Sequence, residues 1–276
     1  MSKDLKLAIL IDADNISEKY IKIILDESSK CGIATYKRIY GDWTNPQLTS
    51  WKRVLLDNSI IPIQQYGYTT GKSSTDSAMI IDAMDILYSG TVDGFCLASS
   101  DSDFTRLAAR LRESGMQVIG MGESKTPKPF ISACNQFKYL DILLASGHAG
   151  AEPETEAAPD PDKSPSPAKK GKGSAPKKSA KPKASEPEPQ TNLNMIKKAI
   201  LALAEECSDD DGWIFSAELG NQLAKRFPDF DVRNFGFSKF TPFINSLGLF
   251  EIKKNQAGPN NNIQLVYYKI KEWERK

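Results

Sequence analysis

The chain has 276 residues, of which 40% are hydrophobic and 26% charged, and its formal net charge is +1. A chain of this length forms one large domain or two modest ones, and this composition is ordinary for a soluble globular protein. Because neither half is strongly basic, charge alone does not identify a nucleic-acid-binding protein.

The histidine and cysteine content of the chain indicates which kinds of catalytic and metal site it can form. The only histidine is His148, which argues against Ser-His-Asp triads, histidine acid–base catalysis and histidine-ligated zinc. Hydrolysis would therefore have to use carboxylates and a metal. The four cysteines are scattered without a CxxC motif, as is typical of reduced thiols in a cytoplasmic protein. No run approaches the ~20 apolar residues of a membrane span, so we expect a cytoplasmic protein without membrane contact.

Strand-like apolar runs alternate with helical patterns in the first half of the chain. The predicted strands cover residues 7–11, 35–40, 60–66, 94–98, 117–121 and 138–143. The predicted helices cover residues 17–29, 46–56, 74–88, 104–113 and 129–135. Gly32, Gly90 and Gly115 follow three of these helices, where left-handed caps are expected. This alternation predicts an α/β domain over residues 1–146, with a parallel sheet covered by helices on both faces.

The composition changes at residue 147. Residues 147–192 contain almost no large apolar side chain and are rich in Pro, Lys and Ala, which predicts a disordered linker. Its lysine block is either a solvated spacer or a weak, salt-sensitive contact with nucleic-acid phosphates. The pattern then predicts helices at 193–206 and 238–247 and strands at 250–253 and 263–270. Helices followed by such a hairpin predict a small winged-helix domain over residues 193–276.

Acidic residues follow two of the predicted strands. Asp12 and Asp14 follow the first strand in LIDADN, and Asp101 and Asp103 follow the fourth in LASSDSDF. Ligands bind beyond the carboxyl ends of the strands in open parallel sheets, and clustered carboxylates repel each other unless a cation lies between them. Helix capping explains a single acid at a helix start, but not two pairs at two strand ends.

The phase of the third long helix adds Asp76 to this group. At ~100° per residue, Asp76 lies in line with Ala83 on the apolar face, in the first turn. A carboxylate there would point at the carboxyl edge of the sheet. Asp82 and Asp85 fall on the opposite side, which we expect to be solvated. The competing interpretation is a capping box that begins at Ser73.

Three functions compete for this acidic site. Oxygen-only ligands favour Mg²⁺ or Mn²⁺ over zinc, and such a metal activates water against a phosphodiester. A haloacid-dehalogenase-like phosphatase would use Asp12 as the nucleophile and Asp14 as the general acid, but no suitable serine, threonine or cap insertion supports it. A non-catalytic RNA-binding adaptor would carry the acids for structural reasons only. Dinucleotide and P-loop motifs are missing after the first strand.

The stretches LIDADN, GKSSTDSAMIIDAMDIL and LASSDSDFTRLAARLRESGMQVIGMG resemble the NYN domain family, a branch of the PIN-like ribonucleases, in the LabA/limkain type. The resemblance covers about residues 5–145 and keeps the order and spacing of these motifs. It implies a PIN-like fold and a metal-dependent RNA nuclease in which Asn15 orients Asp12 and Lys72 meets a substrate phosphate. The implied metal ligands are Asp12, Asp76, Asp101 and Asp103.

The stretch FSAELGNQLAKRFPDFDVRNFGFSKFTPFINSLGLFEI is similar to the LOTUS or OST-HTH winged-helix domain. The similarity implies RNA binding or a protein partner for this domain. Arg233 and Lys239, with Lys253 and Lys254, are the exposed basic candidates for phosphate contact. A tethered RNA-binding domain would raise the local concentration of substrate at the nuclease. The sequence carries no signal for an oligomeric state.

Overall fold

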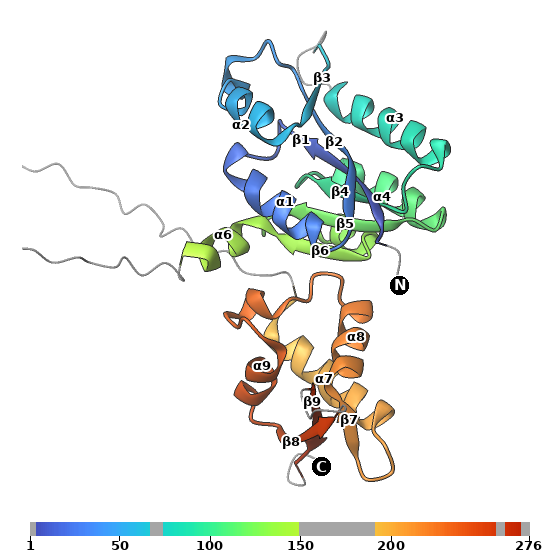
Figure 1. The fold of residues 1–276 in the computed structure, drawn as a ribbon, viewed down its shortest axis with the longest axis vertical. Coiled ribbons are helices and arrows are strands. Elements are labelled where there is room, and N and C mark those ends of the chain that lie inside the picture. The colour runs from blue at the N-terminus through green and yellow to red at the C-terminus, as the bar shows by residue number, and fades with distance from the viewer. Residues whose placement is uncertain (1–3, 67–73, 149–190, 258–262, 272–276) are drawn as a thin grey trace, which may run out of the picture.

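The structure is a computed structural model that describes residues 4–66, 74–148, 191–257 and 263–271 (Figure 1). Lys72 and most of the predicted linker lie outside the described residues. The first two linker positions, Gly147 and His148, belong to a helix.

The first domain is built on a six-stranded sheet in the order β3-β2-β1-β4-β5-β6, and all its strand pairs are parallel. The strands are β1 Lys6–Asp12, β2 Ile33–Gly41, β3 Ile61–Gln64, β4 Gly94–Ala98, β5 Gln117–Gly122 and β6 Gln136–Tyr139. The chain winds outward in both directions from the adjacent strands β1 and β4, so the switch point of the sheet lies between them.

Helices cover both faces of this sheet, as predicted. The helices are α1 Ile21–Ser29, α2 Trp51–Asn58, α3 Ser74–Ser89, α4 Thr105–Glu113, α5 Lys128–Ala133 and α6 Leu140–His148, with short turns at Glu18–Tyr20, Pro46–Leu48 and Ser102–Phe104. Ala8 and Leu10 of β1 pack with α3, α4 and α5, whereas Leu7, Ile9 and Ile11 pack with α1, α2 and α6. Because successive side chains of one strand enter two cores, β1 reads as a continuous apolar run.

Two details differ from the sequence predictions. The strand predicted at residues 138–143 is wrong, since β6 ends at Tyr139 and α6 begins at Leu140. A short apolar run does not distinguish a strand from a buried helix. Gly90 and Gly115 have φ of 64° and 81°, as left-handed caps require, but Gly32 does not. Gly32 is needed for space, because a Cβ there would lie 2.2 Å from the carbonyl oxygen of Leu5.

The C-terminal domain packs three α-helices on a three-stranded antiparallel sheet in the order β7-β9-β8. Its elements are α7 Leu193–Cys207, β7 Trp213–Phe215, α8 Ser216–Arg226, a turn at Val232–Phe235, α9 Phe240–Ser246, β8 Phe250–Ala257 and β9 Ile263–Ile270. The predicted helices and hairpin are present, with β8 extending beyond the predicted 250–253. The sequence did not predict β7, because three residues are too few to show a strand periodicity.

The C-terminal domain lies against the edge strand β6 of the first domain (Figure 1). The backbone N–H of Phe137 in β6 donates to the carbonyl of Pro228 at 2.7 Å. The hydroxyl of Tyr139 donates to the carboxylate of Asp229 at 2.9 Å, and Asp229 is only 3% exposed. An edge strand that would otherwise present unpaired backbone groups is therefore covered by the second domain.

Candidate metal centre

The pairing of β1 with β4 brings the two acidic loops together. Ile11 is in register with Ala98, so Asp12 at the end of β1 lies beside Ser99 after β4. One carboxylate oxygen of Asp12 accepts hydrogen bonds from the Ser99 hydroxyl and the Asn15 side-chain amide, each at 2.7 Å. The other accepts the backbone N–H groups of Asp14 at 3.1 Å and Asn15 at 3.3 Å. Asn15 thus orients Asp12, which is fully buried.

Burial sets the acidity of Asp12. Desolvation raises its pKa, hydrogen bonds from Ser99 and Asn15 lower it, and the charges of Asp76 and Asp14 raise it, with a resulting pKa of about 6. The carboxylate is therefore mostly ionised at neutral pH, although the charges of Asp76 and Asp14 oppose its ionisation. Its negative charge adds to the attraction of this edge for a cation.

Asp76, Asp101 and Asp103 form a tight group of carboxylates. One oxygen from each lies within 4.8 Å of the others. Asp76 comes from the first turn of α3, and Asp101 caps the turn that carries Asp103 by accepting the Asp103 N–H at 2.9 Å. Asp12 is outside this triad, although its charge interacts with that of Asp76. Three close oxygen donors on separate carboxylates fit Mg²⁺ or Mn²⁺, because hard cations prefer such ligands.

Ser99 is a site residue that the sequence reasoning missed. Its hydroxyl donates to Asp12 and accepts the backbone N–H of Asp101 at 3.0 Å, so it joins the two acidic loops. Ser99 is fully buried. The available signal was the pair of serines directly between a buried strand and the acidic residues in SSDSD.

Replacing Ser99 by Ala is expected to weaken Mn²⁺ binding at this site by about 10–100-fold, as loss of an outer-sphere contact does. The variant removes the hydrogen bond that holds Asp12 and the one that holds the Asp101 loop. Calorimetric titration of Mn²⁺ into the protein measures the effect. Ser99→Thr keeps the hydroxyl and serves as the partial rescue, and equal Mn²⁺ affinity of Ser99→Ala and wild type would contradict the assigned role.

Asp82 does not lie in solvent as predicted. Its carboxylate forms an ion pair with Arg38 and accepts a hydrogen bond from the hydroxyl of Tyr40, both on β2. The prediction was wrong because α3 packs its Asp82 side against β2, where these polar groups are available. Asp85, in contrast, is exposed as predicted. The contact fixes α3 on the sheet and thereby the position of Asp76.

Arg233 is not the exposed phosphate contact that the sequence predicted. Its guanidinium donates to both oxygens of Glu27 at 2.7 Å, and it also donates to Asp231. Lys138 of β6 pairs with Asp231 at 2.9 Å. Arg233 therefore joins the two domains, because Glu27 belongs to α1 of the first domain. Lys239, at the start of α9, is exposed and stays a candidate.

Acid is expected to weaken this contact between the domains. Burial works to raise the pKa of Glu27, but the hydrogen bonds and charges of Arg233 and Lys30 outweigh it and lower the pKa from 4.5 to about 2. A carboxylate whose pKa is lowered in the folded protein stabilises the fold at pH values above its ordinary pKa. This contribution to the free energy of unfolding disappears as the pH falls from 4.5 towards 2. Urea unfolding across this pH range measures it. Glu27→Gln should show a smaller pH dependence, and identical pH profiles would contradict the prediction.

Comparisons with known proteins identify both domains. Residues 6–141 match the family model of the NYN domain, and residues 191–261 match that of the OST-HTH/LOTUS domain. The chain contains an NYN domain followed by an OST-HTH/LOTUS domain. The acidic triad and Asp12 lie in the NYN domain, whose family consists of PIN-like nucleases, and both domain types are associated with RNA.

The remaining comparisons add little to this assignment. A crystal structure of a protein of unknown function from Vibrio parahaemolyticus is similar at 18% sequence identity and a TM-score of 0.43, covering 50% of this chain and 94% of that chain. No curated protein matches the chain. Within the ranges that the structure describes, no helix is both long and apolar enough to cross a membrane.

Proposed function

We propose that the protein is a metal-dependent ribonuclease that cleaves RNA phosphodiester bonds. The observation that carries the proposal is the convergence of Asp76, Asp101 and Asp103 within 4.8 Å at the carboxyl edge of a parallel sheet. The NYN domain match, with its family of PIN-like nucleases, supports the same reaction class. The ion is Mg²⁺ or Mn²⁺, since all the donors are carboxylate oxygens.

The residues have distinct roles in this proposal. Asp76, Asp101 and Asp103 hold the cation. The buried Asp12 either supplies a fourth acidic ligand or attracts the cation through its negative charge alone. Asn15 and Ser99 hold the Asp12 carboxylate in one orientation. Lys72, in the segment before α3, meets a substrate phosphate. A bound divalent cation would lower the pKa of water and offset charge on the phosphate under attack.

The phosphatase alternative is disfavoured by the surroundings of Asp12. Its side chain is fully buried, and its two oxygens accept four hydrogen bonds. A nucleophilic carboxylate needs an oxygen that reaches the substrate phosphorus. Asp12 is therefore a positioned charge in this proposal and not an attacking group.

The proposal is tested by incubating end-labelled RNA with the purified chain in Mg²⁺ or Mn²⁺. Cleavage that requires either metal and stops with EDTA supports the nuclease. RNA binding that persists without cleavage, across several RNAs and both metals, would instead favour the non-catalytic adaptor. Asp85→Asn, which changes an exposed acid on the same helix as Asp76, controls for a general effect of removing negative charge.

The OST-HTH domain acts as a second RNA-binding domain or holds a protein partner in this proposal. Its docking on β6 means that it does not act only as a loosely tethered module. Because Arg233 forms an ion pair with Glu27, the RNA contacts of this domain must come from other residues. The four cysteines are free thiols, which fits a cytoplasmic location.

A further inference from the structure

The helix that winged-helix proteins usually insert into a major groove is poorly suited to nucleic acid here. In this topology it is α9, which contains no Lys or Arg. Its most exposed residues are Pro242, Asn245 and Ser246. Lys239, directly before the helix, is the sole cation next to it in the sequence. Duplex binding draws most of its affinity from phosphate contacts, which this helix does not offer.

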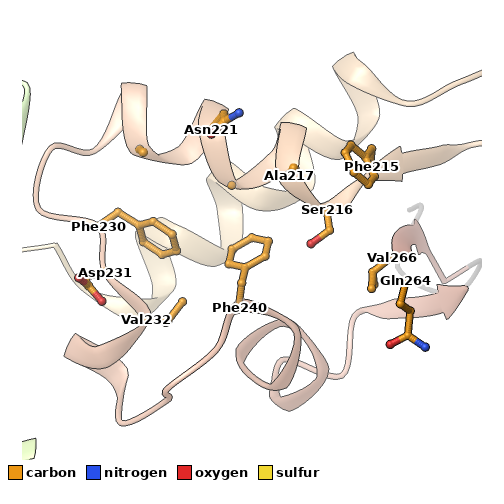
Figure 2. Close-up of a pocket in the computed structure, with 12 residues that line it drawn as sticks. Phe215, Ser216, Ala217, Asn221, Phe230, Asp231, Val232, Phe240, Gln264 and Val266 are labelled. Carbon is orange, nitrogen blue, oxygen red and sulfur yellow. The ribbon is translucent and has the colours of Figure 1, made fainter. Parts of the chain in front are cut away.

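A groove of the C-terminal domain, formed by α8, the segment at residues 230–232 and the neighbouring parts of α9 and β9, is also unsuited to binding phosphate. It has a volume of about 550 Å³ and is lined by the aromatic rings of Phe230 and Phe240 and by small residues of α8 such as Ala217 (Figure 2). None of the described residues that line it is Lys or Arg. Its acidic member, Asp231, already binds Arg233 and Lys138.

The outer face of the three-stranded sheet, unlike α9 and this groove, carries both aromatic and basic side chains. Tyr268 of β9 is buried in the core, so its neighbours Tyr267 and Lys269 lie on the opposite face. The strand register pairs Tyr267 with Phe215 and Lys269 with Trp213. These four side chains are all partly exposed. Aromatic and basic residues thus alternate on the side of the sheet that faces away from the core.

Two lysines converge on one ring of this face. The Nζ atoms of Lys253 and Lys269 lie 5.5 Å and 5.8 Å from the centroid of the Trp213 ring, within cation–π range. The rings of Phe215 and Tyr267 lie 5.4 Å apart beside them. We call these five residues the sheet platform. Among the described strand residues of this face, Glu251, opposite Lys269 in β8, is the acid beside the two lysines, and Asp209, in the turn before β7, accepts the backbone N–H of Trp213 at 2.7 Å.

We propose that the sheet platform binds single-stranded RNA, with bases stacked on its aromatic rings and phosphates contacting Lys253 and Lys269. The inference rests on the proposed function in taking RNA as the substrate. Aromatic rings interleaved with cations bind single strands of any sequence, because every base has a face that stacks and every nucleotide has a phosphate. An acidic peptide would use the two lysines but not the three rings.

The proposal is tested by fluorescence anisotropy on the full chain carrying Asp101→Asn and Asp103→Asn, with a fluorescein-labelled 12-nucleotide single-stranded RNA in EDTA. Trp213→Leu is expected to weaken binding roughly tenfold, from the loss of a stacking surface. Lys253→Gln with Lys269→Gln should weaken binding and reduce the slope of log K against log salt by about 1.4, since each single-strand phosphate contact contributes about 0.7.

Lys198→Gln is the matched control, because Lys198 is an exposed lysine of α7, the helix that packs on the core face of the same sheet. It should change the affinity little. Thermal melting verifies that each variant folds, and the lysine pair tests the platform even if Trp213→Leu does not fold. Parent-like affinity and salt slope in the folded lysine variant would overturn the proposal, as would equally strong competition by an acidic peptide.

These outcomes are separable from failure of the nuclease proposal, because binding is measured without cleavage. A chain that binds through the platform but never cuts RNA refutes only the ribonuclease. A chain that cuts RNA with no loss of binding in the platform variants refutes only the platform.

Discussion

Asp101→Asn is expected to reduce Mg²⁺- or Mn²⁺-dependent RNA cleavage by more than about 100-fold, because loss of outer-sphere contacts alone costs about 10–100-fold. The substitution is close to isosteric. Its remaining carbonyl oxygen can still accept the Asp103 N–H, so the turn that begins at Ser102 keeps its cap. What is lost is one negative charge in a group of three carboxylates within 4.8 Å.

The measurement is the initial rate of cleavage of a labelled RNA over a titration of Mn²⁺. Calorimetric titration of Mn²⁺ into the protein without RNA gives a second readout, in which Asp101→Asn and Asp76→Asn should bind the ion more weakly. Asp85→Asn, exposed on α3, should leave both values unchanged. Full activity in both Asp101→Asn and Asp103→Asn would refute the assignment of the site.

Arg233→Ala is expected to lower the free energy of unfolding by about 3 kcal/mol, the low end of the range for removing one partner of a buried ion pair, because each carboxylate keeps a lysine partner. The side chains of Glu27 and Asp231 are only 6% and 12% exposed, and both lose the guanidinium, which leaves Lys30 beside Glu27 and Lys138 beside Asp231. The stability that is lost should be that of the contact between the two domains. The NYN and OST-HTH domains should therefore unfold in separate transitions, and small-angle scattering should show a larger particle.

The control for this prediction is Arg53→Ala. The Arg53 side chain is 92% exposed and lies 3.9 Å from Asp57, so its removal should change stability by less than about 0.5 kcal/mol. Arg233→Lys keeps the charge but lacks the planar fork that binds both oxygens of Glu27, and its effect should lie between the two. A single unchanged unfolding transition in Arg233→Ala would contradict the assigned role.

The candidate site shows what a pattern can and cannot predict. Helix phase placed Asp76 at the carboxyl edge of the sheet, because a periodicity of 3.6 residues links position to direction. The same argument failed for Asp82, since phase does not reveal that β2 presents Arg38 and Tyr40 to that side of the helix. Ser99 was not predicted as a site residue, because serine is common in the loops that follow strands.

Local sequence determined most of the strands and helices and the acidic strand ends, since periodicity, glycine caps and apolar runs act over a few neighbouring residues. Only the tertiary structure decided which ends meet, because β1 and β4 become neighbours through pairing across more than eighty residues. It also decided that Arg233 holds Glu27, at a separation of 206 residues, and so is not available to RNA. Charge along a chain identifies a cation, but only packing identifies its partner.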